Sequence, residues 1–378
     1  MSFPSFGRMN FLNFLECSIP MNSIHYGFLS PKAACKGMNR HHPANQFVQR
    51  TKTLLASVLI TVSTVVPAQE QNTDQTPLPV ALVNQLNKLS SGPHDGFRAN
   101  HAKGVMVTGT FTPAASASSI SRAPHFLHPV PVTVRFSNGT GVPTLPDASP
   151  KASPHGMAIR FDLGDGASTD IVSISASAFP VATPEDFLAM LTAVGASGTD
   201  AAKPTPIEKF LASHPAALKF VTTPRPAPES FATLPFYGIN AFKFTNSKGE
   251  SNFIRYRIVP AAGMHSLTDE ASAKMSPNYL MEELPSRINI APVSFTVFAQ
   301  LANANDNIVD PTVSWSESNP LVQLGTITLT KAITDQVPEQ RKILFNPVSL
   351  PDGIEPSADP ILAIRFPTYA VSYGQRAQ

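Results

Sequence analysis

The sequence predicts an α+β fold in which an antiparallel β-sheet or closed barrel is interrupted by helices and followed by a C-terminal helix. Apolar and polar residues alternate in six to eight segments, which is the period of half-buried strands. Ser or Thr followed by Pro opens several segments between them, as is typical of helix starts. Consecutive strands with helical insertions favour antiparallel pairing.

The first 68 residues differ from the rest and predict an exported protein. Basic residues precede an apolar run over 54–66, and Val66-Pro-Ala68 then offers small residues for signal peptidase. The run is too short to span a bilayer as a helix. We expect a signal peptide over 38–68 with cleavage near Ala68, preceded by an upstream extension or disordered leader over 1–37, and a periplasmic or secreted mature protein.

Charge and cysteine content exclude several classes of function. The chain has 378 residues with 28 Lys/Arg and 26 Asp/Glu; residues 1–68 hold six of the bases and one acid, so the remainder has 22 bases, 25 acids and a net charge of −3. Such a chain is a poor binder of nucleic acid, which requires cations for the phosphates. Both cysteines, Cys17 and Cys35, also lie in the leader. The mature chain therefore has no disulfide, thiolate metal site or Cys nucleophile, and we expect no stable membrane span.

The elements up to residue 161 follow from periodicity. Residues 69–91 predict a polar linker and then a helix, because Leu82, Leu86 and Leu89 recur at helical spacing. The remaining domain, over 92–378, begins with period two. Strands are expected over 105–111, 130–137 and 157–161.

Helix starts and one hairpin organise the rest of the chain. A hydroxyl residue precedes proline at three expected helix starts, Thr183-Pro184, Thr205-Pro206 and Ser276-Pro277. The loop 246–249 contains Gly and predicts a hairpin between strands near 242–245 and 253–258. Further strands are expected over 293–301 and 322–329.

Arg135 and Ser137 share the polar face of the strand over 130–137. If that face points to solvent, Arg135 is an ordinary surface charge. If it lines a barrel interior, the guanidinium needs a buried anionic partner. No acidic residue lies nearby in the sequence, which makes a ligand carboxylate a reasonable alternative.

The C-terminal helix carries Arg365, Tyr369 and Arg376 on one face. A cation one turn from a phenol favours the phenolate form, and a phenolate is one of the few protein groups that hold haem iron. The same pattern is also typical of an ordinary amphipathic helix. Arg98 and His101, at the entry to the first strand, form no motif on physical grounds alone.

Three of these segments together resemble the haem catalases: 97–104, 134–138 and 365–369. Segments 184–187, 345–347 and 351–355 extend the resemblance in the same order. It covers about residues 92–376 and is strongest to the catalase-related peroxidases, a short exported bacterial branch. It implies an antiparallel β-barrel with helical insertions, a C-terminal helix on the proximal side of the haem, and haem b as cofactor.

The resemblance also implies a role for each candidate residue. Tyr369 would be the axial iron ligand with Arg365 beside it, and Phe187 would pack on the macrocycle. His101 would transfer a proton between the peroxide oxygens while Ser137 fixes its orientation. The haem propionates would pair with three arginines, Arg98, Arg135 and Arg376.

The implied function is a haem-dependent peroxidase that reduces hydrogen peroxide or organic hydroperoxides with small organic electron donors. Ile174 replaces the asparagine that positions peroxide in full catalases, so dismutation should be weakened. Pro367 should kink the C-terminal helix. The chain also ends where full catalases continue with a segment that wraps around the molecule, which would leave the haem edge open to organic donors. Alternatives are a true catalase, a non-catalytic haem-binding protein and a cofactor-free exported ligand-binding protein.

Overall fold

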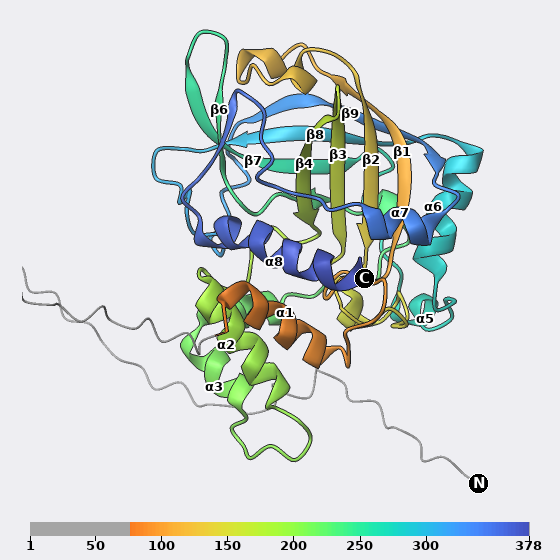
Figure 1. Cartoon of the computed structure of the whole chain (residues 1–378), viewed down its shortest axis with the longest axis vertical. Helices are drawn as coiled ribbons and strands as arrows, with labels where there is room; N and C mark the ends of the chain where they lie inside the picture. Colours follow the sequence, from red (N-terminus) through yellow and green to blue (C-terminus); the bar gives the residue numbers. More distant parts are fainter. Residues whose placement is uncertain (1–75, 378) are drawn as a thin grey trace, which may run out of the picture. The chain divides into compact units, whose positions relative to one another are not determined.

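The structure is a computed structural model that describes residues 76–377. The predicted leader, the cleavage site near Ala68, both cysteines and the first part of the predicted linker lie outside the described residues. The described part folds around one β-barrel, with helices on more than one side of it (Figure 1).

Eight antiparallel strands close into the barrel, in agreement with the predicted fold. Their order is β7-β5-β4-β3-β2-β1-β9-β8, and pairing of β8 with β7 completes the ring. Two further strands extend it, because β6 pairs with β7 and β10 pairs with β6. The strands are β1 (Gly104–Pro113), β2 (Val130–Ser137), β3 (Gly156–Gly164), β4 (Ala167–Ile174), β5 (Phe236–Tyr237), β6 (Phe242–Thr245), β7 (Ser251–Pro260), β8 (Val293–Leu301), β9 (Leu321–Ala332) and β10 (Ile354–Pro356).

The period-two pattern of the strands fills the barrel with apolar side chains. On β2, Val132, Val134 and Phe136 are buried in the core cluster, together with aromatic side chains from the facing strands. The rings of Phe111 and Phe161 meet edge to face with centroids 5.2 Å apart, an arrangement that aromatic pairs prefer. The opposite face of each strand is therefore free to build a site outside the barrel.

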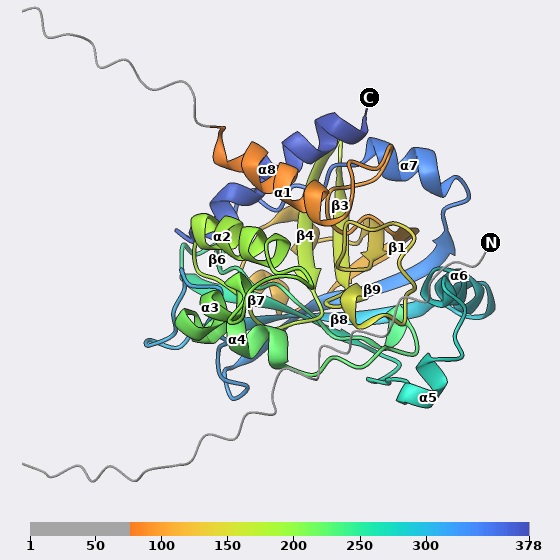
Figure 2. The same ribbon diagram turned by 90° about the horizontal axis from the view of Figure 1, so that it is seen from below.

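The helices are insertions and terminal extensions of the barrel. Their bounds are α1 (Leu78–Leu89), α2 (Pro184–Gly195), α3 (Pro206–Ser213), α4 (Pro215–Thr222), α5 (Asp269–Ser272), α6 (Tyr279–Ile290), α7 (Gln336–Lys342) and α8 (Pro360–Arg376). The C-terminal helix α8 lies between the barrel and α1, and α2 packs beside α1 (Figures 1 and 2). The two ends of the described chain thus meet over the outer face of β2–β4.

The predicted N-caps agree with the structure at two of the three helices. Thr183 accepts a hydrogen bond from Asp186 N, and Thr205 forms a full capping box with Glu208. The prediction that Ser276 caps the third helix is wrong, because α6 begins at Tyr279. Asp147, from a distant loop, accepts the Leu280 N–H at 2.9 Å and so replaces the expected local cap.

Pro367 lies inside α8, and the helix continues through it from Pro360 to Arg376. Ala363, Phe366 and Pro367 are all exposed, so the Ala363 carbonyl that lacks a donor is on the solvent side. Solvent can satisfy that carbonyl, which removes part of the cost of an internal proline.

Within residues 76–377, no helix is both long and apolar enough to cross a bilayer.

His125 is buried among the aromatic residues of the barrel core. It lies in the 3₁₀ turn Pro124–Phe126 and is 1% exposed. Its ring centroid is 4.9 Å from that of Phe161, and neither ring nitrogen has a hydrogen-bond partner. Burial lowers the pKa of His125 from 6.5 to about 3, because the charged imidazolium cannot be solvated there.

We predict that His125→Leu flattens the acid dependence of stability. Between about pH 3 and 6.5, His125 is neutral when folded but protonated when unfolded, so its contribution favours unfolding as the pH falls below 6.5. Lowering the pH from 7.5 to 5 should therefore cost the wild type about 2 kcal/mol more than the variant. Urea unfolding at both pH values measures this difference.

His128→Leu is the matched control, because His128 is exposed in the folded chain. It should retain the wild-type loss of stability between pH 7.5 and 5. An unchanged loss in His125→Leu would contradict the assignment of acid sensitivity to the buried ring.

Candidate active site

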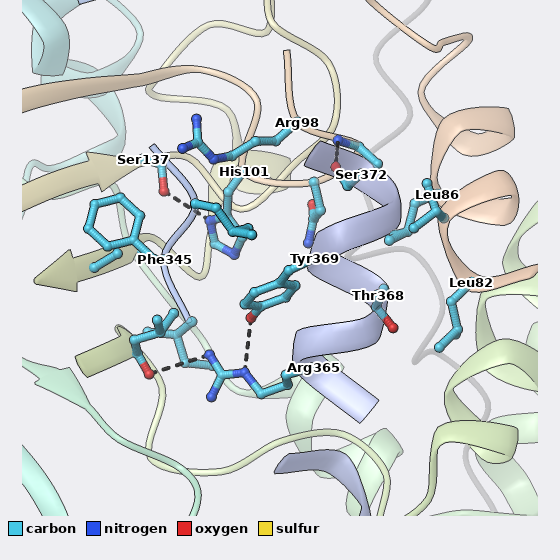
Figure 3. Close-up of a pocket in the computed structure, with 18 of the residues that line it drawn as sticks. Leu82, Leu86, Arg98, His101, Ser137, Phe345, Arg365, Thr368, Tyr369 and Ser372 are labelled. Atoms are coloured by element: carbon cyan, nitrogen blue, oxygen red, sulfur yellow. Dashed lines mark hydrogen bonds between the residues drawn. The ribbon is translucent and has the colours of Figure 1, made fainter. Parts of the chain in front are cut away.

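A cavity lies between the outer face of β2–β4 and the helices α8 and α1 (Figure 3). It brings together every residue that the sequence analysis assigns to a site. The lining includes His101, Ser137, Arg98, Arg135, Arg376, Arg365, Tyr369, Phe187 and Ile174. Segments far apart in the sequence thus form one site, as the resemblance implies.

Tyr369 projects from α8 into this cavity, with Arg365 one helical turn before it. Arg365 Nε donates to the phenol oxygen of Tyr369 at 2.9 Å, and its Nη1 donates to Asn240 Oδ1 at 2.6 Å. The guanidinium is therefore held from both sides. Its Nε–H is thereby aimed at the phenol oxygen in a charge-assisted hydrogen bond.

Asn240 connects this pair to the beginning of α8. Its Nδ2 donates at 2.7 Å to Asp359, which is 1% exposed. Asp359 is also the N-cap of α8 and accepts the N–H groups of Ile361 and Leu362. Burial raises the pKa of Asp359, and its hydrogen bonds partly oppose that shift. The same carboxylate thus starts the helix and, through Asn240, orients Arg365.

His101 faces the cavity from the barrel side, and Ser137 sets its orientation. Its Nδ1 is 3.0 Å from Ser137 Oγ, which leaves Nε2 as the nitrogen available to a ligand. The neighbouring strand carries Gly156, where a Cβ atom would lie 2.7 Å from Ser137 Oγ and 2.9 Å from His101 Nδ1. A side chain at position 156 would therefore displace this pair from its present geometry.

The backbone and electrostatics of His101 are both unusual. Its φ of 54° is in the left-handed region, a strained conformation that persists only where surroundings enforce it. Arg135 Nη2 donates to its carbonyl at 2.9 Å. Burial, followed by the charge of Arg135 and other nearby cations, lowers the pKa of His101 to about 3. The imidazole is consequently neutral near pH 7 and can accept a proton.

Three arginines, Arg98, Arg135 and Arg376, gather at one end of the cavity. Arg98 and Arg376 both donate to the Ile343 carbonyl, at 3.0 and 2.7 Å. No carboxylate forms an ion pair with any of the three within residues 76–377. The Nε of Arg376 is buried without any hydrogen-bond partner there.

The surroundings of these arginines disfavour their charged form. Burial and then the neighbouring Arg376 lower the pKa of Arg135 to about 9, and burial lowers that of Arg376 to about 10. The pKa of Arg98 is lowered by burial and by both other arginines. A bound dianion would relieve all three shifts, because opposite charge favours the protonated form.

The structure corrects both sequence-based placements of Arg135. The residue faces neither solvent nor the barrel interior, because it lies on the outer face of β2 and is only 3% exposed. Gln340 of α7 covers it and accepts its Nε at 2.8 Å. The expectation of an anionic ligand is strengthened, because the remaining bonds of Arg135 go to backbone carbonyls.

The rest of the cavity wall is apolar. Phe187 reaches it from α2 and packs on Phe179 with ring centroids 5.0 Å apart. Ile174, at the end of β4, occupies the barrel side, and Phe345 lies in the segment after α7. Further apolar residues come from α1 and α8: Leu82, Val83, Leu86, Ile361 and Ile364. This lining suits a large flat apolar group with charged substituents at one end.

Sequence reasoning missed the residues that hold the site in place. Asn240 and Gln340 are uncharged and lie in no motif, so no sequence signal identifies them. Asp359 followed by Pro360 does carry a helix-start signal. Ser372 accepts the Ala99 N–H at 3.1 Å and thereby ties α8 to the segment that contains His101.

Comparison with known proteins shows similarity to catalases and catalase-related peroxidases. The sequence model of the family described as Catalase matches residues 95–377. The chain is 36% identical over 287 residues to the catalase-related peroxidase of Mycolicibacterium paratuberculosis, covering 75% of this chain and 90% of that protein. It is 32% identical over 293 residues to the catalase-related peroxidase of Synechococcus elongatus, covering 76% and 85%.

Solved structures show the same fold. A fungal catalase superposes with a TM-score of 0.67 at 20% identity, covering 78% of this chain and 62% of the catalase. This chain therefore spans less than two thirds of that protein. The agreement confirms the predicted barrel with helical insertions.

We predict that Asn240→Ala lowers the free energy of unfolding by about 2–4 kcal/mol, because Asp359 and Arg365 each lose a buried hydrogen-bond partner. Urea unfolding of the full chain measures the change. Asn252→Ala is the control, since Asn252 is exposed on β7 and its loss should cost less than about 0.5 kcal/mol. Equal effects of the two substitutions would contradict the bridging role of Asn240.

Proposed function

The chain belongs to the catalase family, whose members are oxidoreductases that act on peroxide, and on that premise we propose a more specific function. The protein is a haem peroxidase that reduces hydrogen peroxide or organic hydroperoxides with small organic electron donors. The observation that carries this proposal is one apolar cavity with a tyrosine on one wall, a neutral histidine on another and, at one end, three arginines that have no acidic partner within residues 76–377.

The residues present fit haem b. Its two propionates match the three arginines that lack an acidic partner among residues 76–377, and the orphaned Nε of Arg376 supplies a buried donor for them. Its macrocycle matches the apolar walls that include Phe187 and Phe345. Tyr369 would hold the iron through its phenol oxygen, to which Arg365 Nε donates.

Bound haem would supply the redox-active iron at which peroxide is cleaved and to which donors return electrons. His101 would take a proton from one peroxide oxygen at Nε2 and return it to the other, so that the leaving oxygen departs as water. Ser137 keeps Nδ1 engaged during this transfer. Because burial and nearby cations keep His101 neutral, a proton acceptor is available at neutral pH.

Ile174 supports reduction with organic donors over dismutation of two peroxides. Its side chain lines the cavity from the end of β4 and has no group that can hydrogen-bond to peroxide. Dismutation requires a second peroxide to be oriented, which this apolar wall does not support.

We also propose that the protein acts in the periplasm or outside the cell. The basis is the sequence alone: basic residues, the apolar run over 54–66 and the small residues that end at Ala68.

We predict that His101→Ala retains haem but reacts with hydrogen peroxide about 10²–10⁴-fold more slowly, the usual contribution of a positioned acid–base group. Stopped-flow absorbance of the loaded full-length chain, with guaiacol as donor in parallel steady-state assays, measures the loss. His265→Ala is the control, because His265 is exposed and distant in the sequence from the site residues.

Two outcomes would contradict the proposal. Undiminished peroxide reactivity in His101→Ala would indicate a haem-binding protein without histidine-assisted turnover. Rapid oxygen evolution from peroxide without any donor would indicate a true catalase, and the weight given to Ile174 would then be wrong.

A further inference from the structure

The guanidinium of Arg135 is held by a set of hydrogen bonds that leaves one nitrogen free. Nε donates to Gln340 Oε1 at 2.8 Å, and Nη2 donates to the carbonyls of His101 and Ala102 at 2.9 and 3.0 Å. An arginine has five N–H donors in a rigid plane. Those of Nη1 have no partner within residues 76–377, so the plane is fixed while one edge can bind a ligand in the cavity.

The amide of Gln340 can point in only one direction. Its Nε2 donates to the Gly104 carbonyl at 3.0 Å and to Gln336 Oε1 at 3.2 Å. Gln336 is itself fixed, since it accepts the Met106 N–H and donates to the Met106 carbonyl, each at 2.7 Å. Because a guanidinium only donates, Oε1 of Gln340 must face Arg135.

Gly104 provides the space that this arrangement needs. A Cβ atom there would lie 2.6 Å from Cζ of Arg135 and 2.5 Å from the Phe136 carbonyl oxygen. The guanidinium therefore lies directly against the backbone of β1, with Gln340 on its other flank.

The same short segment contacts the other two arginines. Three residues after Gln340, the Ile343 carbonyl accepts hydrogen bonds from Arg98 and Arg376. Residues 340–343 thus contact all three arginines, and the oxygens that accept their hydrogen bonds are an amide and a backbone carbonyl, both uncharged. A carboxylate at position 340 would instead form an ion pair with Arg135 and use up the charge that an anionic ligand requires.

We propose that Gln340 is a positioning residue. It holds the guanidinium of Arg135 in place without neutralising its charge, so that the guanidinium can bind a carboxylate of the porphyrin. This inference rests on the proposed function, because it takes haem as the anionic ligand. The amide oxygen orients the guanidinium, and its neutrality preserves the positive charge at Nη1.

The test compares Gln340→Glu and Gln340→Met with wild type in the full-length chain loaded with haem b or with haem dimethyl ester, which lacks both anionic carboxylates. The rate of transfer to excess apomyoglobin measures retention of each porphyrin. Both variants should lose haem b about tenfold faster, the factor expected when a hydrogen bond to a charged group is lost. Loss of the ester should remain at the wild-type rate.

Val337→Glu is the matched control, because Val337 is 65% exposed on the same helix and the substitution adds the same charge as Gln340→Glu. It should retain both porphyrins as the wild type does. Gln340→Met tests the missing acceptor without adding charge, so the inference does not depend on whether the glutamate variant folds.

Three results would overturn the inference, and they have different meanings. Wild-type rates of haem loss in both Gln340 variants would refute the positioning role and leave the proposed function standing. Equal acceleration for haem and its ester would show a merely structural role. A wild-type chain that takes up neither porphyrin would contradict the proposed function and, with it, this inference.

Discussion

The charge of three arginines that have no acidic partner among residues 76–377 is the constraint on which the site depends. Arg135 and Arg376 are almost fully buried, and Arg98 stands beside them at the same cavity. Burying a cation without a counter-charge is costly, and the lowered pKa values of all three record that cost. The fold tolerates it because backbone carbonyls and one glutamine hold the guanidiniums in place. Binding of a dianion would then be favoured, because it would offset the cost of burying these charges.

The apolar core and the candidate site lie on opposite faces of the barrel strands. The inner face of the barrel carries the apolar core, whereas the outer face of β2–β4 carries Arg135, Ser137 and the wall at Ile174. Helix α8 closes that outer face and brings Tyr369 opposite to His101. Because Asp359 both caps α8 and holds Asn240, the start of the helix and the orientation of Arg365 are set together. The two sides of the cavity that carry Tyr369 and His101 are thus each connected to the strands or helices around them.

Much of this could be predicted from the sequence where the signal is local. Period-two alternation located the strands that build most of the barrel, and Thr183 and Thr205 located two helix starts. The start of α6 could not be predicted, because its cap, Asp147, comes from another part of the chain. Asn240 and Gln340 were missed for the same reason: each contacts an arginine more than a hundred positions away. The burial of Arg135 on the outer face also required knowledge of where α7 packs.

The most direct test of the central claim is the absorption spectrum of the freshly purified full-length chain and of its Tyr369→Phe variant. If the arginines and Tyr369 form a haem site, the wild type should show a Soret band with the high-spin ferric features of a phenolate-ligated haem. The variant should lose that band or shift it. A wild-type chain without Soret absorbance after reconstitution, or a variant with an unchanged spectrum, would contradict the account.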